Sequence, residues 1–214
     1  MVPDFLIQSL QFTYKDFNLT LGLRKFSFLF TALCIVALIN AINMLDGIDG
    51  QVALYSFFFV VIFQIFIYQD LSIFLVTLGI SLLFFFILNI RGNIFLGNSG
   101  SYLLGFIFSF LFLSEYKNDN ISINFILMFV ILPALELLRV CLNRLINGRN
   151  PFKGDRDHLH HLLFKRFNKS QSIIIFQIIF IMPFILYYFG LNKISALIFS
   201  LITYLILVVF LKKA

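Results

Sequence analysis

Long apolar runs divide the chain at nearly regular intervals, and charged side chains are absent from them. A bilayer core about 30 Å thick takes about 20 helical residues at about 1.5 Å each. Seven such runs have 16 to 23 residues, and the fifth reaches full length by continuing through Glu136 toward Val140. The runs are 26–45, 50–69, 71–90, 92–114, 120–135, 170–192 and 194–211. They lack the alternation of a membrane barrel, so the pattern predicts about seven transmembrane helices.

Composition supports this interpretation and excludes a soluble domain. Of the 214 residues, 61% are hydrophobic and 12% are charged, and the mean hydropathy is +0.99. Soluble domains have about 45–50% apolar and about 25% charged residues. We therefore expect an all-α fold, a polytopic membrane helix bundle without internal linkers or repeats. Residues 1–25 form an N-terminal juxtamembrane segment with an interfacial piece at Phe5–Phe12, and residues 26–214 form the transmembrane domain.

The net charge is +6, and the distribution of the sixteen Lys and Arg residues along the chain indicates how the protein is oriented in the membrane. When the predicted loops alternate across the membrane, eleven of the sixteen fall on one side, many of them in the loop 139–169. The positive-inside rule places that side in the cytoplasm. Arg24 and Lys25, just before the first helix, oppose this orientation but are outnumbered. The excess of cations thus indicates orientation, and we expect no nucleic-acid partner.

The first polar cluster follows the first apolar run, at Asn40, Asn43, Asp46, Asp49 and Gly50. Asn43 and Asp46 are one turn apart on a shared face if the helix continues through them. Carboxylates and carboxamides at a helix end suit a hydrated divalent cation and polar hydroxyl groups. The alternative is a helix C-terminus with an ordinary polar turn.

The second cluster is Gly97-Asn98-Ser99-Gly100-Ser101, between the third and fourth runs. Glycines that bracket small polar residues before a helix leave backbone N–H groups exposed, and these can face phosphate. Ser99 or Ser101 can equally be a plain N-cap, and Gly97 a plain C-cap.

The third cluster holds all three histidines of the protein, His158, His160 and His161, close to Lys153 and Arg156. Such a run can bind a metal, or it can contact a pyrophosphate as donors beside the cations. Solvated loop residues are the alternative. All three clusters fall on the predicted cytoplasmic side, so we expect the active-site face there.

Together the clusters resemble the polyprenyl-phosphate N-acetylhexosamine-1-phosphate transferases, the MraY/WecA-type enzymes. The family pattern Asn-Ala-x-Asn-x-x-Asp-Gly-x-Asp-Gly appears at 40–50, and Phe-x-Gly-Asp-x-Gly-Ser is similar to 95–101. The signature Pro-Phe-x-x-Asp-Arg-x-His-x-His-His of the WecA-like branch is similar to 151–161. The resemblance covers roughly residues 20–170.

This resemblance implies transfer of an N-acetylhexosamine 1-phosphate from a UDP-sugar to polyprenyl (undecaprenyl) phosphate, with release of UMP, as the start of an envelope glycan. It implies Mg²⁺ as the cofactor, with Mn²⁺ as an alternative, and a UDP-N-acetylhexosamine, the lipid phosphate and the membrane as partners. A homodimer is compatible with it. The expected location is the bacterial inner membrane, with several passes and cytoplasmic active-site loops.

The resemblance also implies roles for individual residues, in three groups. The implied catalytic residues are Asp46, Asp49, Asn98 and His160. The implied substrate-binding residues are Asn40, Gly97, Ser99, Arg156, His158 and His161. The implied metal ligands are Asn43, Asp46 and Asn98.

Three departures from the family bear on activity. Asn98 stands where the family has an acidic residue, and Glu136 stands where relatives often carry Asp after a Pro. The family also has an Asp-Asp motif after further N-terminal helices, whereas these 214 residues contain no adjacent Asp pair. We therefore expect a fragment of a longer protein or a shortened relative.

Two other functions stay open beside the transferase. An inactive member can act as a scaffold or lipid-carrier-binding protein, which Asn98 favours. A small transporter is the other, but transporter sites lie near the bilayer midplane, whereas these clusters lie at one interface.

Overall fold

The computed structural model describes residues 6–14, 17–68, 71–148, 150 and 158–212. The chain is predominantly helical, and a short hairpin precedes the helices. The elements are β1 (Ser9–Tyr14), β2 (Phe17–Gly22), the 3₁₀ turn η1 (Arg24–Phe26), α1 (Ser27–Leu45), α2 (Gln51–Ile67), α3 (Ile73–Asn89), α4 (Gly97–Lys117), α5 (Ile123–Ile146), α6 (Leu159–Phe164), α7 (Lys169–Tyr188) and α8 (Lys193–Lys212). The predicted all-α membrane bundle is confirmed.

Each predicted apolar run corresponds to one helix, and α6 is an extra short helix between α5 and α7. Among the described residues, five helices are long and apolar enough to cross a membrane: α1 with η1, α4, α5, α7 and α8. Helices α2 and α3 are also apolar, with 17 residues each, at the short end of the range of about 17–25 residues that spans need. The protein is thus a multi-pass membrane protein.

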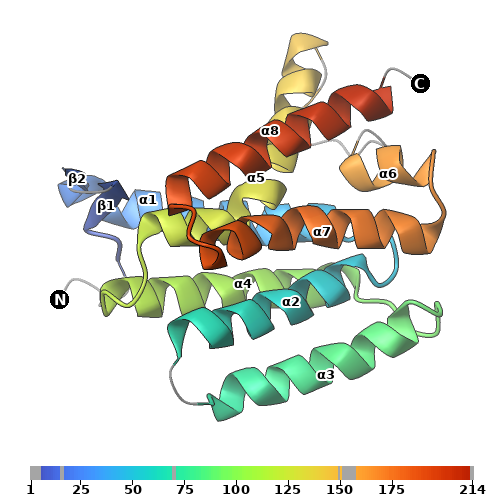
Figure 1. Cartoon of the computed structure of the whole chain (residues 1–214), viewed down its shortest axis with the longest axis horizontal. Helices are drawn as coiled ribbons and strands as arrows, with labels where there is room; N and C mark the ends of the chain where they lie inside the picture. Colours follow the sequence, from blue (N-terminus) through green and yellow to red (C-terminus); the bar gives the residue numbers. More distant parts are fainter. Residues whose placement is uncertain (1–5, 15–16, 69–70, 149, 151–157, 213–214) are drawn as a thin grey trace.

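Helices α1, α2, α3, α4, α7 and α8 run lengthwise, with their loops at two ends (Figure 1). The contact between α1 and α4 depends on Gly105, because an added Cβ there would lie 2.7 Å from the Cα of Ile39. In the core, the Phe59 ring of α2 stacks on Phe108 of α4 with 3.8 Å between centroids, and it lies 4.7 Å from the ring of Phe129 in α5. Aromatic packing therefore joins helices that are distant in sequence.

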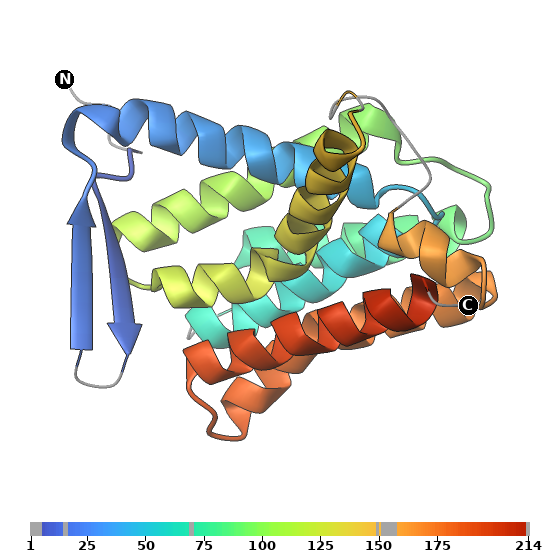
Figure 2. The same ribbon diagram turned by 90° about the horizontal axis from the view of Figure 1, so that it is seen from above.

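Helix α5 bends part-way along its length. Pro133 lies inside it, and proline removes a backbone hydrogen bond and kinks a helix. The second half of α5 turns away from the long axis of the bundle in both views (Figures 1 and 2). The bend directs the part that carries Glu136 and Arg139 toward α8 and α6.

The N-terminal segment contains an antiparallel hairpin that overlaps the predicted interfacial piece at Phe5–Phe12, and its place at the membrane interface stays a prediction. Its register pairs Leu10 with Leu21 and Phe12 with Leu19, so the apolar residues alternate along both strands. The Tyr116 hydroxyl of α4 donates to the carbonyl of Ser9 at 2.8 Å, which fixes the hairpin to the bundle. The period of two in Ser9–Tyr14 is typical of a strand.

The cations separate between the two ends of the bundle. The hairpin lies at one end, and α6 with the end of α8 lies at the other (Figure 2). Described cations at the α6 end include Arg91, Lys165, Arg166, Lys169 and Lys212, and those at the hairpin end are Arg24, Lys25, Lys117 and Lys193. Each of these cations lies at the end that the loop alternation predicts for it, and the cytoplasmic orientation stays a prediction.

Candidate functional site

The described parts of the three polar clusters come together at one end of the bundle, which we call the polar end. It is formed by residues 40–50 at the end of α1, residues 90–101 around the start of α4, and residues 158–161 at the start of α6. In both views these segments lie at the end opposite the hairpin (Figures 1 and 2). The alternation of long helices explains this, because α1 and α3 end where α2, α4 and α7 begin.

A side-chain hydrogen bond joins the first cluster to the second. The buried Ser101 hydroxyl donates to the Asn43 Oδ1 at 2.6 Å and lies 3.1 Å from the carbonyl oxygens of Gly97 and Asn98. Helices α1 and α4 run antiparallel and in close contact. Asp46, one turn after Asn43, and Asn98, one turn before Ser101, therefore lie at the same level of the polar end.

Asn89, which sequence reasoning missed, ties the same two loops together. This buried residue at the end of α3 accepts from the backbone N–H of Gly50 at 2.6 Å and donates to the carbonyl of Ile94 at 2.7 Å. The signal in the sequence that could have pointed to Asn89 is a carboxamide near the end of an apolar run. Through its two hydrogen bonds, Asn89 holds the α1–α2 loop against the α3–α4 loop.

The two aspartates of the first cluster have different surroundings. The Asp49 carboxylate pairs with Lys169 Nζ at 2.9 Å, and the same ammonium donates to the carbonyl of Ile90 at 3.0 Å. Burial, and then the charge of Asp49, raise the pKa of Asp46. Within the described part of the chain, the Asp46 carboxylate has no hydrogen bond or ion pair. Asp46 is thus the carboxylate that would gain most from an added cation.

The sequence places Lys169 at the end of the predicted cytoplasmic loop 139–169, as one of its many cations. Its pairing joins residues separated by 120 positions, so no local motif could have assigned it to Asp49.

The histidines lie against the first cluster. His160 is 2% exposed, and a Cβ added at Gly47 would lie 1.8 Å from its Nε2, so the ring sits directly over that glycine. The rings of His158 and His160 are nearly parallel, with centroids 5.4 Å apart, and His161 lies 4.3 Å from His160. Burial, followed by the charges of His161 and His158, lowers the pKa of His160 to about 3. A neutral imidazole therefore faces the loop that carries Asp46.

Not every predicted site residue joins this arrangement. The Asn40 amide donates to the carbonyl of Val36 in its own helix at 2.8 Å, and none of the hydrogen bonds among described residues links it to the other clusters. Gly97, Asn98 and Ser99 are exposed at the start of α4. Arg156 lies outside the described residues.

The donors at the polar end suit a hard cation. In the described ranges, no group of three His, Cys, Asp or Glu residues is close enough to hold a metal ion. Mg²⁺ is usually held by one or two carboxylates, with water and substrate phosphates as its other ligands. One partly buried and unpaired carboxylate, Asp46, with the amides of Asn43 and Asn98 nearby in the fold, matches that type of oxygen donor set.

Comparison with known proteins identifies the family. The model of glycosyl transferase family 4 matches residues 1–115, more than half of the chain. The chain belongs to glycosyl transferase family 4. The prediction made from its motifs is confirmed.

Several curated relatives share one name, undecaprenyl-phosphate alpha-N-acetylglucosaminyl 1-phosphate transferase. The protein from Yersinia pestis is 27% identical over 186 residues, which cover 81% of this chain and 50% of the relative. The one from Salmonella typhi is 30% identical over 191 residues, covering 78% and 48%. The one from Thermotoga maritima is 29% identical over 147 residues, covering 68% and 46%. The chain spans about half the length of the curated relatives it matches.

Proposed function

We propose that this protein transfers an N-acetylhexosamine 1-phosphate from a UDP-sugar to a polyprenyl phosphate and releases UMP, as the first step of an envelope glycan. The observation that carries the proposal is the meeting of three separate polar clusters at one end of a membrane bundle. The names of the relatives support a lipid phosphate acceptor and an N-acetylglucosaminyl 1-phosphate donor group. An acceptor of this kind explains why the site lies at the end of apolar helices.

The reaction needs alignment and charge neutralisation more than covalent chemistry by the protein. An oxygen of the polyprenyl phosphate bonds to the β-phosphorus of the UDP-sugar. The bond from that phosphorus to the bridging oxygen breaks, and UMP leaves with the oxygen and its electron pair. The exposed N-terminal turn of α4, at Gly97, Asn98 and Ser99, suits contact with the diphosphate. The neutral His160 can donate one hydrogen bond to it.

A divalent cation fits beside these residues. Mg²⁺, or Mn²⁺ in its place, would be held by Asp46 with Asn98 and Asn43, and it would neutralise phosphate charge during transfer. Asp46 supplies the carboxylate, because Asp49 is already paired with Lys169. The Asp49 pair orders the loop, and the cations around the polar end attract the anionic donor.

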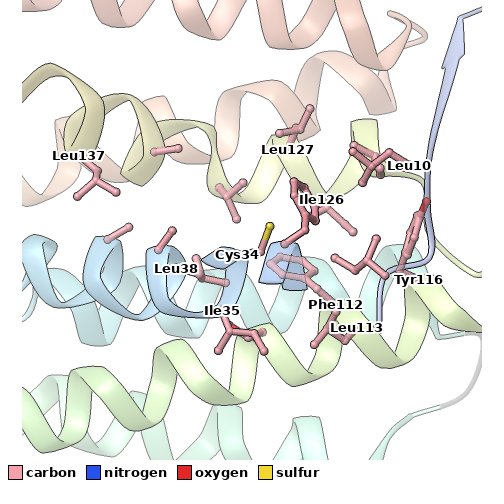
Figure 3. A pocket seen from close by; sticks show the side chains of 18 of the residues that line it. Leu10, Cys34, Ile35, Leu38, Phe112, Leu113, Tyr116, Ile126, Leu127 and Leu137 are labelled. Carbon is pink, nitrogen blue, oxygen red and sulfur yellow. The ribbon is translucent and has the colours of Figure 1, made fainter. Parts of the chain in front are cut away.

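An apolar cavity beside α1 suits the hydrocarbon chain of the acceptor. Its volume is about 380 Å³, and it lies between α1, α4, α5 and the hairpin (Figure 3). Its lining extends along α1 from Phe30 to Ala41, which is two residues before Asn43. A chain in this cavity would therefore point its phosphate toward the polar end. Cys34 lies near the middle of the lining (Figure 3).

The test is transfer by the purified chain in detergent or lipid nanodiscs. UDP-N-acetylglucosamine, polyprenyl phosphate and Mg²⁺ should yield a sugar-labelled lipid and UMP in equal amounts. Asp46→Asn should reduce the rate by at least about a hundredfold, because it removes the charge that the proposal assigns to the cation site. A rate that is unchanged in Asp46→Asn would exclude this role.

Asn98 favours a second candidate function, a membrane protein that binds the donor or the lipid carrier without transfer. A carboxamide keeps the shape of an aspartate but lacks its charge, so it binds a divalent cation less well. This candidate predicts UDP-sugar binding without lipid product in the parent chain, and product in Asn98→Asp. Equal transfer by the parent and Asn98→Asp would argue against it.

A further inference from the structure

A buried carboxylate outside the three clusters connects three helices. Glu136 lies in the membrane-spanning helix α5, just past the bend at Pro133, and is 1% exposed. Arg139 of the same helix, Tyr204 of α8 and the backbone N–H of Leu159 in α6 all donate to it. Charged groups at membrane depth are costly unless they are paired, so such an arrangement suggests a specific role.

The geometry leaves the Glu136 carboxylate no capacity for chemistry of its own. Its Oε1 accepts from Arg139 Nη2 at 2.5 Å and from Leu159 N at 2.7 Å. Its Oε2 accepts from the Tyr204 hydroxyl at 2.7 Å and, more weakly, from Arg139 Nε at 3.4 Å. A carboxylate has about four acceptor positions, and all of them are used. Glu136 is therefore neither a free base nor a free metal ligand.

The bond to Leu159 acts on the start of α6, where the histidines lie. His158 is the N-cap of α6, and its Nδ1 lies 3.5 Å from Glu136 Oε1. The first turn of α6 carries His160, whose ring lies over Gly47. The carboxylate thus stands at the base of the short helix that holds His160 against the loop between α1 and α2.

We propose that Glu136 is a positioning residue that fixes α6, and with it His160, over Gly47 for the transfer reaction. The importance of this placement for transfer rests on the proposed function, whereas the placement itself can be tested without it. A helix of six residues has little stability alone, so it needs tertiary contacts to keep its position. Glu136 supplies one through Leu159 and is itself held by α8 through Tyr204.

The charge of Glu136 is required as well as its shape. Four donor contacts converge on it, from Arg139, Tyr204 and Leu159. In Glu136→Gln, an amide N–H would have to face one of these donors, which leaves a buried donor unsatisfied. Glu136→Asp keeps the charge with a side chain one methylene shorter, so it should hold His160 in place better than Glu136→Gln does, though less well than the parent.

The experiment measures how fast diethyl pyrocarbonate acylates each histidine of the full chain in micelles at fixed pH, with mass spectrometry of the peptide that contains 158–161. In the parent, His160 should react at least about tenfold more slowly than the more exposed His161. Glu136→Gln should raise the His160 rate about tenfold. Glu136→Asp should give an intermediate rate, and Tyr204→Phe a rise of about twofold to threefold.

Glu115→Gln is the matched control. Glu115 is also buried in a membrane helix, where it accepts from the Tyr68 hydroxyl at 2.8 Å and from Asn120 Nδ2 at 2.6 Å, but it lies at the hairpin end. It should lower the melting temperature without changing the His160 rate. The proposal is overturned if the His160 rate stays within twofold of the parent in both Glu136→Gln and Tyr204→Phe. It is also overturned if Glu115→Gln raises that rate as much as Glu136→Gln does, since the effect would then be general destabilisation.

This outcome is independent of catalysis. Loss of His160 protection in a chain that shows no transfer would support the positioning role and count against the proposed function. Transfer by a chain in which Glu136→Gln leaves the His160 rate unchanged would support the proposed function and count against the positioning role.

Discussion

Replacing Gly47 by alanine should disable the polar end while leaving the bundle folded. The added Cβ would lie 1.8 Å from His160 Nε2, and ordinary contact begins at 3.4 Å, so the ring or the loop must move by about 1.6 Å. His160 is buried, so it has little free space to rotate into. Misplacing a catalytic group by about 1 Å can cost about a hundredfold in rate. We expect Gly47→Ala to lose at least that factor in transfer.

The cost in stability should be smaller than the cost in rate. Overpacking a buried site typically costs about 1–3 kcal/mol, which the loop can partly absorb because it lies at the end of the bundle. The measurement compares initial transfer rates and melting temperatures of the parent and Gly47→Ala. Gly22→Ala is the control, since a Cβ added at Gly22 meets nothing within 4 Å. It should match the parent in both.

A double variant tests whether contact with the ring is the cause. Once His160→Ala has removed the imidazole, adding Gly47→Ala should cost no further activity, and the two effects should be strongly non-additive. The reasoning is refuted if Gly47→Ala transfers within twofold of the parent. It is also refuted if Gly47→Ala lowers the rate as much in the His160→Ala background as in the parent.

Three further predictions use other features of the structure. Lys169→Met should lower transfer more than tenfold with little change in melting temperature, because exposed ion pairs contribute at most about 1 kcal/mol to stability. Lys169→Arg should retain most of the activity. Equal losses of activity in both variants would contradict the role of the ion pair with Asp49. The pKa of His160, about 3, lies below the pKa of free imidazole, about 6.5. Between these values the unfolded chain binds a proton that the folded chain does not, so stability should fall as the pH drops from about 6.5 to about 3. In thermal melts, His160→Gln should reduce this dependence of the melting temperature on pH. Cys34→Phe should raise the KM for polyprenyl phosphate several-fold by filling the cavity, whereas Ile80→Phe, an exposed position outside its lining, should not.

The long helices could be predicted from the sequence because bilayer thickness fixes the length of an apolar run. The runs 26–45 and 92–114 became α1 and α4 with small shifts at their ends. The hairpin was missed because its alternation, at Ser9–Tyr14 and Phe17–Gly22, is short and lies beside much stronger helical signals.

The meeting of the polar clusters could also be predicted, since alternating helices bring loops of the same side together. The contacts that organise them could not. Lys169 reaches Asp49 across 120 positions, and Glu136 reaches Leu159 across 23 positions after the bend in α5. Such pairs depend on helix packing and on the angle after Pro133, for which no local pattern in the sequence is a guide.

The most direct test of the account follows the two phosphorus atoms of the donor separately. UDP-N-acetylglucosamine labelled with ³²P at either the α- or the β-phosphate is incubated with the purified chain, polyprenyl phosphate and Mg²⁺, and the lipid phase is counted. We predict that the β-label enters the lipid, that the α-label is released into the water phase as UMP, and that Asp46→Asn slows both lipid labelling and UMP release by at least about a hundredfold. Failure of the β-label to enter the lipid, with Asn98 as well as with Asn98→Asp, would contradict the proposed transfer.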